Sequence, residues 1–299
     1  MITPLTGLIA APYTPMHEDG SLNLAMIEKQ AALLIEQGVA GAFICGTTGE
    51  GPSLTINERI QLAERWAAHR EDRLALVVHV GHNSLAEARA LAAHAQKLGA
   101  DAIAAFPPSF FKPNQVEDLV AYCAALTAAA PEVPFYYYHI PAMTGVRLPM
   151  AAFLQNGRDK IPTLRGLKFS DMNLVEYQQC LGLDDGAFNI LFGVDEMLLG
   201  ALAVGGAGAV GSTYNYAAAL YLRMIEAYRA GDKNTAQTCT RHAVNLVEIL
   251  LDFGLLAAGK ALMALRGVEC GPVRPPLRNL TGKQRTRLYD RVRALPIFG

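Results

Sequence analysis

The sequence lacks an excess of charge of either sign, because 26 lysines and arginines stand against 27 acidic residues, for a formal net charge of −1. Without a basic surface field, neither nucleic acid nor an anionic membrane is an expected partner. The few cysteines include no C-x-x-C pair: Cys45, Cys123, Cys180, Cys239 and Cys270. Scattered cysteines of this kind are typical of small buried side chains in a reducing compartment.

Long apolar runs are also missing. No uninterrupted apolar segment has the length needed to cross a bilayer. The segment Met1–Leu5 has neither the charged start nor the long apolar stretch of a signal peptide. We therefore expect a soluble, cytoplasmic protein.

Several motifs that indicate a nucleotide cofactor or a nucleophilic serine are absent. No G-x-G-x-x-G follows the first apolar run, and there is no Walker loop or G-x-S-x-G turn. His79 and His82 are the one pair with a spacing that suggests a metal, and no further ligand lies nearby in the sequence. The sequence therefore predicts no metal and no organic cofactor.

What the chain does have is a regular alternation of apolar strands and amphipathic helices. About eight such units fit before residue 230, which is the number needed for a closed (β/α)8 TIM barrel. Three junctions, at residues 37–44, 98–104 and 204–210, repeat one pattern in which a helix ends in glycine and runs into a strand of small residues. Continuous apolar strands of this kind belong to a parallel sheet that is covered on both faces. An open doubly wound sheet is the competing interpretation.

The pattern predicts specific boundaries for these elements. Capping boxes at Thr55-x-x-Glu58 and Ser84-x-x-Glu87 indicate two helix starts. The expected strands are 7–12, 40–45, 74–80, 102–106, 133–139, 164–170, 187–192 and 207–211. The expected helices up to residue 230 are 23–37, 55–69, 84–99, 115–130, 150–156, 174–183, 196–204 and 217–230. Residues 1–230 are thus expected to form the barrel. Residues 231–299 are expected to form a helical extension packed on it, with helices at 234–253, 255–265 and 281–295.

The strand Leu164–Ser170 contains a lysine at an unusual place. Because strand side chains alternate, Gly166, Lys168 and Ser170 share one face, and Lys168 points into the barrel if the other face packs under helices. Burial lowers the pKa of an amine and makes it a nucleophile toward a carbonyl. The alternative is a lysine whose stem is buried and whose amine reaches water. Lys260 lies in an apolar helical stretch and is a second candidate, ranked lower because it is on no strand.

Polar residues follow other expected strands, and in a barrel these positions converge on one mouth. Thr47 and Thr48 suit an anion such as a carboxylate, although an ordinary glycine-rich turn would look the same. In the strand with three tyrosines, Tyr136 and Tyr138 are expected to face inward and Tyr137 outward. Tyr138 is then placed to move a proton, unless it is an ordinary core tyrosine.

Two acids, Asp195 and Glu196, follow the seventh strand after Gly193, and Ser212 follows the eighth. The acids are suited to hold sugar hydroxyls, or equally to cap the next helix. Taken together, the mouth has an amine to attack a ketone, hydroxyls for the neighbouring carboxylate and a phenol for the proton. This set predicts a pyruvate-dependent aldolase.

The same stretches resemble the N-acetylneuraminate lyase family, within the larger group that includes dihydrodipicolinate synthase. The resemblance covers about residues 7–295. Its motifs are Gly46-Thr47-Thr48-Gly49-Glu50, Tyr138 to Gly145, Gly166-Leu167-Lys168-Phe169-Ser170, Phe192 to Glu196, and Gly211 to Asn215. The first motif is common to the whole group, and the others are closer to the lyases.

The resemblance implies a role for each of these residues. Lys168 is implied as the Schiff-base lysine and Tyr138 as the proton donor. Thr47 and Thr48 are implied as contacts to the carboxylate. The contacts implied for the sugar chain are Ser170, Gly193, Asp195, Glu196 and Ser212. The family also implies reversible cleavage of N-acetylneuraminate to N-acetylmannosamine and pyruvate, and a homotetramer.

Two positions mark the limits of the resemblance. Many relatives have a tyrosine on the loop where this chain has Phe110 and Phe111, which puts a hydroxyl relay there in doubt and leaves a stacking role toward a neighbouring subunit. Dihydrodipicolinate synthases typically have an arginine at the position of Met143. The alternatives are an aldolase of that kind, a keto-deoxy-sugar-acid aldolase, or a barrel that binds a sugar acid without catalysis.

Overall fold

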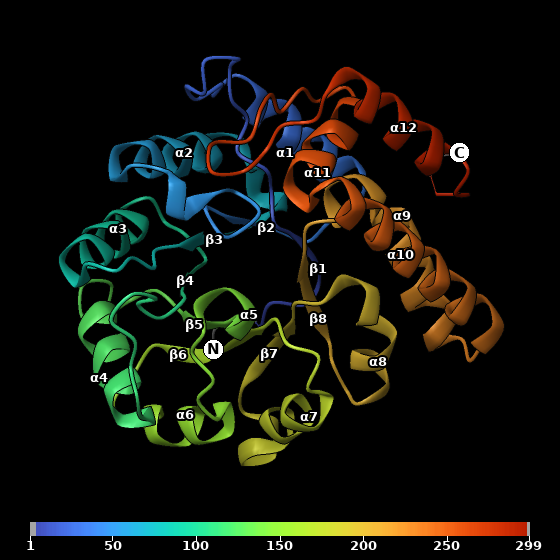
Figure 1. The fold of residues 1–299 in the computed structure, drawn as a ribbon. Coiled ribbons are helices and arrows are strands. Elements are labelled where there is room, and N and C mark those ends of the chain that lie inside the picture. Colours follow the sequence, from blue (N-terminus) through green and yellow to red (C-terminus); the bar gives the residue numbers. More distant parts are fainter. Residues whose placement is uncertain (1–3, 298–299) are drawn as a thin grey trace.

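Eight short parallel strands close into a barrel in the order of the sequence, with each strand next to its successor and the last next to the first (Figure 1). The structure is a computed structural model that describes residues 4–297. The strands are β1 (Gly7–Ala10), β2 (Gly41–Ile44), β3 (Ala75–His79), β4 (Ala102–Ala105), β5 (Phe135–His139), β6 (Leu164–Phe169), β7 (Asn189–Phe192) and β8 (Gly208–Gly211). The predicted (β/α)8 barrel is confirmed, and the open sheet is wrong.

Helices surround the barrel and cover the outer face of its strands (Figure 1). Those up to residue 230 are α1 (Met26–Glu36), α2 (Ile56–His69), α3 (Leu85–Lys97), α4 (Val116–Thr127), α5 (Pro141–Thr144), α6 (Met150–Gly157), α7 (Leu174–Gly182), α8 (Leu198–Ala203) and α9 (Tyr214–Arg229). Three more helices follow the barrel: α10 (Lys233–Phe253), α11 (Leu255–Ala264) and α12 (Gly282–Arg293). Residues 1–3 and 298–299, at the ends of the segments considered above, lie outside the described range. No helix within residues 4–297 has the length and apolar character needed to cross a membrane.

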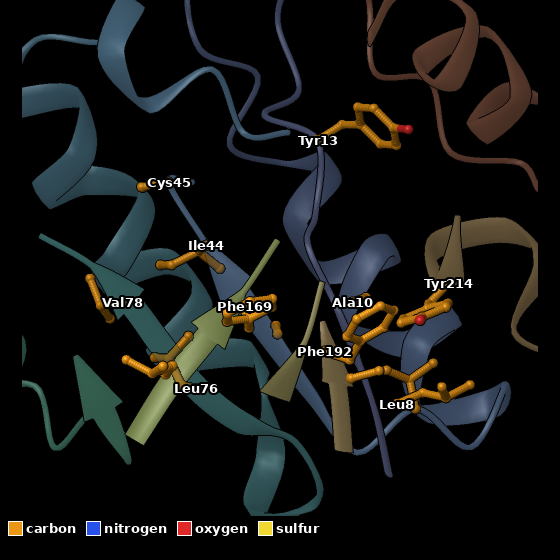
Figure 2. Packing of buried hydrophobic residues seen from close by; sticks show 14 of the residues in the cluster. Leu8, Ala10, Tyr13, Ile44, Cys45, Leu76, Val78, Phe169, Phe192 and Tyr214 are labelled. Atoms are coloured by element: carbon orange, nitrogen blue, oxygen red, sulfur yellow. The ribbon is translucent and has the colours of Figure 1, made fainter. Parts of the chain in front are cut away.

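Alternation along the strands divides the core in two. Outward side chains such as Leu8, Ile44, Phe169 and Phe192 pack under the helices (Figure 2). Inward side chains form a separate cluster inside the barrel: Ile9, Ala11, Phe43, Val77, Ala102, Ala104, Tyr136, Tyr138, Leu191 and Val210. Burying one large apolar side chain stabilises the fold by roughly 1.5–3 kcal/mol. A shift of one residue in register would exchange the two sets, so burial strongly specifies which side chains face the interior.

Local signals set several helix starts. The capping box of Thr55 and Glu58 is present with both of its hydrogen bonds, and it opens α2. At α3, Ser84 accepts the hydrogen bond from the Glu87 amide, which is the first half of the predicted box.

Two stretches differ from the expected boundaries. The short helix α5 follows β5 directly, with Pro141 at its first position, where a missing amide costs nothing. Helix α9 begins at Tyr214 rather than near residue 217, and its backbone is kinked at Ala217, where the sequence predicted the start.

Candidate active site

Lys168 and Tyr138 lie side by side inside the barrel. They are register partners on the neighbouring strands β6 and β5, close to the ends where barrel enzymes carry their chemistry. Lys168 is only 4% exposed, and its Nζ lies against Phe43 and Tyr138 of the inner cluster, so the side chain points inward and does not reach out to bulk water. Tyr136 and Tyr138 belong to the inner cluster and Tyr137 to the outer one. The predicted orientations of all four side chains are confirmed.

The amine of Lys168 is held between two aromatic rings. Its Nζ lies 4.2 Å from the ring centre of Phe43 and 4.0 Å from that of Tyr138. The two rings meet edge to face, with centroids 5.5 Å apart. These two ring contacts restrict the positions open to the amine. The sequence reasoning did not single out Phe43, although alternation along β2 places it on the inner face.

Thr47 connects the loop after β2 to the tyrosine. Its Oγ1 lies 3.2 Å from the hydroxyl of Tyr138, and either group can donate the hydrogen bond. Thr48 next to it is buried. Hydroxyls, Tyr138 and the Lys168 amine therefore share one end of the barrel, as the sequence predicts.

Asp195 is buried and faces the start of α9. Its Oδ2 accepts hydrogen bonds from the amide of Thr213 at 2.9 Å and from the Thr213 hydroxyl at 2.6 Å. Because that proton is given to the carboxylate, the hydroxyl of Tyr221, 2.8 Å from Thr213 Oγ1, is left to donate to the threonine. Asp195 thus binds Thr213, which lies between β8 and α9. The sequence analysis considered sugar hydroxyls or the next helix as partners of this acid, and did not name Thr213.

Burial governs the titration of both acids. It raises the pKa of Asp195, against the hydrogen bonds from Thr213 and the charge of Lys168, which lower it. Burial also raises the pKa of Glu196, and the negative charge of Asp195 adds to this. Both carboxyl groups are therefore weaker acids than usual, and their oxygens provide hydrogen-bond acceptors on this side of the mouth.

Gly193 leaves room for Ser170 at the end of β6. A Cβ at position 193 would lie 2.1 Å from Ser170 Oγ, so a side chain there would displace the serine. The Gly193 amide donates to the Phe169 carbonyl at 2.7 Å, which joins the ends of β6 and β7. The predicted neighbours Ser170 and Gly193 are thus in direct contact.

Ser212 lies near a tyrosine that the sequence reasoning did not single out. Tyr13 is buried, and burial raises the pKa of its phenol, while the nearby hydroxyls of Tyr216 and Ser212 oppose this rise. The carbonyl of Ser212 accepts from Asn215 Nδ2 at 2.8 Å. No local pattern marks Tyr13, because its position depends on contacts with distant parts of the chain.

The two histidines considered as metal ligands have other partners. His79 Nε2 accepts from the amide of Phe106 at 3.2 Å, and Arg59 donates to the His79 carbonyl at 2.6 Å. Burial, with the charges of Arg59 and Lys168, holds the pKa of His79 well below its usual value, so the imidazole is neutral. His82 Nδ1 accepts from the Ser84 amide. Within residues 4–297 there is no group of three His, Cys, Asp or Glu side chains placed to share a metal ion.

Lys260, the second candidate lysine, is engaged elsewhere. It is buried on α11, and its Nζ pairs with Glu50 Oε1 at 2.7 Å and donates to the Pro272 carbonyl at 2.6 Å. The amine at the barrel mouth is that of Lys168.

The fold and this arrangement define a class of protein, the (β/α)8 barrels with an inward lysine and tyrosine on neighbouring strands. The model of the dihydrodipicolinate synthetase family matches residues 4–295, and the chain belongs to this family.

Curated relatives and solved structures agree on a narrower group. The N-acetylneuraminate lyase of Sus scrofa is 44% identical over 98% of this chain and 94% of its own, and that of Homo sapiens is 46% identical over 91% and 87%. The structure of Proteus mirabilis N-acetylneuraminate lyase superposes with a TM-score of 0.97 at 43% identity, over 99% of this chain and 100% of its own. That of the Aliivibrio salmonicida sialic acid aldolase has the same TM-score at 45% identity, over 99% and 98%. The expectation of a carbon–carbon lyase is confirmed.

Proposed function

We propose that this enzyme is a sialic acid aldolase, which reversibly cleaves N-acetylneuraminate to N-acetylmannosamine and pyruvate through an imine on Lys168. The observation that carries the proposal is the buried amine of Lys168, caged by Phe43 and Tyr138, with the Thr47 hydroxyl bonded to the same tyrosine. The names of similar relatives, the N-acetylneuraminate lyases of Sus scrofa and Proteus mirabilis, support the substrate.

The proposed reaction begins when the amine of Lys168 attacks the ketone of the open-chain sugar acid. Water leaves and a protonated imine forms. The bond between the α and β carbons then breaks, and its electron pair moves toward the imine to give an enamine. The hydroxyl on the departing carbon loses its proton and becomes the aldehyde. The enamine left on Lys168 then takes up a proton at carbon, and water releases pyruvate and restores the amine.

Tyr138 is the proposed group that moves the proton in the cleavage step. Its hydroxyl is at the same end of the barrel as the amine and is bonded to Thr47, which orients it. Thr47 and Thr48 are the proposed contacts to the substrate carboxylate.

The proposed contacts to the sugar chain are on the other side of the mouth: Ser170, Gly193, Asp195, Glu196 and Ser212. Since Thr213 occupies Oδ2 of Asp195, contact with a sugar hydroxyl is left to Oδ1 of that residue. Glu196 and the serines supply further acceptors and hydroxyls.

We also propose that the enzyme is a homotetramer that works in the cytoplasm. Phe110 and Phe111, 79% and 85% exposed, are apolar surface suited to a neighbouring subunit. All five cysteines are buried and free, as expected in a reducing compartment.

Trapping with borohydride tests the chemistry. Reduction in the presence of pyruvate should add a stable mass to the peptide that contains Lys168, and the Lys168→Met variant should not be labelled. Labelling at Lys260, or no labelling of the unmodified enzyme, would contradict the proposal and favour a barrel that binds without catalysis.

Condensation of pyruvate with two aldehydes tests the substrate. Met143 offers no charge to a second carboxylate, and a lost charge-assisted hydrogen bond costs roughly 1.5–3 kcal/mol, about ten- to a hundredfold in affinity. N-acetylmannosamine should therefore react faster than aspartate semialdehyde. The opposite order would support the dihydrodipicolinate synthase alternative.

A further inference from the structure

The loop that carries Thr47 and Thr48 has a strained backbone. Cys45 and Glu50, at its two ends, have φ of 58° and 53°, in the left-handed region that non-glycine residues rarely adopt. The loop is also tightly closed, because the Gly51 amide donates to the Gly46 carbonyl at 3.0 Å, and a Cβ at Gly51 would lie 1.9 Å from the Cys45 carbonyl oxygen. Such a conformation persists only where its surroundings hold it.

Glu50 is held by residues of the C-terminal extension. Its carboxylate pairs through Oε1 with Lys260 Nζ at 2.7 Å, and the two side chains are 1% and 2% exposed. The other oxygen accepts from the amide of Arg274 at 2.8 Å. The carboxylate therefore has partners on both α11 and the segment that follows it.

The extension is itself fixed to the barrel around this loop. Lys260 also donates to the Pro272 carbonyl, and the Arg274 guanidinium pairs with Glu58 of α2 and donates to the carbonyls of Gly20 and Ser53. Figure 1 shows α11 and the chain after it on the same side of the barrel as α1 and α2. The residues that hold Glu50 are therefore themselves joined to the barrel by several hydrogen bonds and an ion pair.

A buried ion pair is weak evidence of a stabilising role, because an apolar pair of similar size often stabilises a fold as well or better. Unlike an apolar pair, this ion pair fixes the Glu50 carboxylate in one position. That point is two residues from Thr48 and three from Thr47, whose hydroxyl lies 3.2 Å from that of Tyr138.

We propose that Lys260 and Glu50 are positioning residues, through which the C-terminal extension holds Thr47 and Thr48 at the distance that binding of the pyruvate carboxylate requires. The inference rests on the proposed function of that loop. Neither residue touches the reacting atoms, and both act on the affinity for the keto acid.

The test compares Lys260→Met, Glu50→Gln and the double variant. Each single variant should raise the KM for pyruvate about tenfold or more, since displacement of a binding group by about 1 Å costs up to roughly a hundredfold. The KM for N-acetylmannosamine and the imine trapped on Lys168 at saturating pyruvate should stay near those of the unmodified enzyme.

The double variant separates loss of the positioning role from destabilisation by an unpaired buried charge. It leaves no lone buried charge, so its melting temperature should recover relative to the single variants, while the KM for pyruvate stays raised. Recovery of both, or a normal KM in the double variant, would overturn the proposal in favour of a purely structural pair. This readout remains if a single variant fails to fold.

Leu288→Ala is the matched control, because it removes a fully buried side chain of α12 without touching the loop. It should lower the melting temperature and leave the KM for pyruvate unchanged. If the unmodified enzyme forms no imine with pyruvate, the proposed function has failed. If it does and the variants bind pyruvate normally, the positioning role alone has failed.

Discussion

At the residue scale, the mouth of the barrel contains two buried ionisable groups, Lys168 and Asp195, in different surroundings. The Lys168 amine lies against two rings, whereas Asp195 is desolvated and hydrogen bonded by Thr213. Burial raises the pKa of Asp195, so the folded protein binds its proton more tightly than the unfolded chain does. Two single substitutions, one of them with a matched control, test the roles of groups at this mouth.

Tyr138→Phe should keep the fold and lose most of the turnover. The ring that covers the Lys168 amine remains, but the hydroxyl that moves the proton is gone, and such groups contribute about 10²- to 10⁴-fold in rate. Steady-state cleavage of N-acetylneuraminate measures the effect.

Tyr136→Phe is the control for that experiment. Tyr136 is an inward tyrosine on the same strand, and its hydroxyl donates to Asn189 Oδ1 at 2.8 Å instead of facing Thr47. It should turn over at near the normal rate. Near-normal turnover in Tyr138→Phe as well would mean that another group moves the proton.

Asp195→Asn should change the pH dependence of stability. Because the pKa is raised in the folded state, the charged carboxylate costs stability once the pH exceeds its ordinary value of 3.8. The asparagine oxygen can still accept from Thr213 and carries no charge. The melting temperature of the variant relative to the unmodified enzyme should therefore rise between about pH 4 and neutrality. A constant difference across this range would contradict the assignment.

At the scale of elements, the start of α2 is joined to the chain after α11. Glu58 closes the capping box with Thr55 and also pairs with Arg274. The Arg274 guanidinium, helped by hydrogen bonds from Thr55, lowers the pKa of Glu58 from 4.5 to about 2, against the effect of burial. One side chain therefore serves both a local and a distant contact.

Glu58→Gln should destabilise the protein in a pH-dependent way. A lowered pKa means that the stabilisation is fully present above pH 4.5 and is lost as the pH falls toward about 2. The melting temperatures of the variant and the unmodified protein should differ at neutral pH and converge in this acid range. If the gap is the same at pH 3 and pH 7, the ion pair is not its source.

At the scale of the whole molecule, one apolar surface lies near the barrel mouth. Phe110 and Phe111 follow β4, are both exposed, and stack edge to face on each other at 5.0 Å. Large exposed apolar side chains in a cluster mark an association surface more often than chance.

The variant Phe110→Glu with Phe111→Glu should have a lower oligomeric mass than the unmodified enzyme. Where two subunits meet at this surface, each would contribute two glutamates, so four carboxylates would lie close together. Each of them would lose its hydration on burial. Light scattering after size-exclusion chromatography measures the mass. Phe110→Leu with Phe111→Leu keeps the surface apolar and should keep the mass. An unchanged mass in the glutamate variant would place the subunit contacts elsewhere.

The sequence by itself determined those features whose physics is local. Alternation along a strand has a period of two, so the inward direction of Lys168 and Tyr138 follows once the strands are recognised. The capping box at Thr55 needs only its own turn, and repeated strand–helix units are sufficient to predict the barrel. The roles of the two residues in catalysis remain predictions.

Only the tertiary structure decided the contacts between distant segments. The cage of Phe43 and Tyr138 around the amine exists because closure of the barrel brings β2 opposite β6. Likewise, Asp195 binds Thr213 and Lys260 pairs with Glu50 because folding places them together, and no spacing in the sequence indicates either partner. A buried charge requires a partner. Which partner it finds depends on the packing of the whole chain.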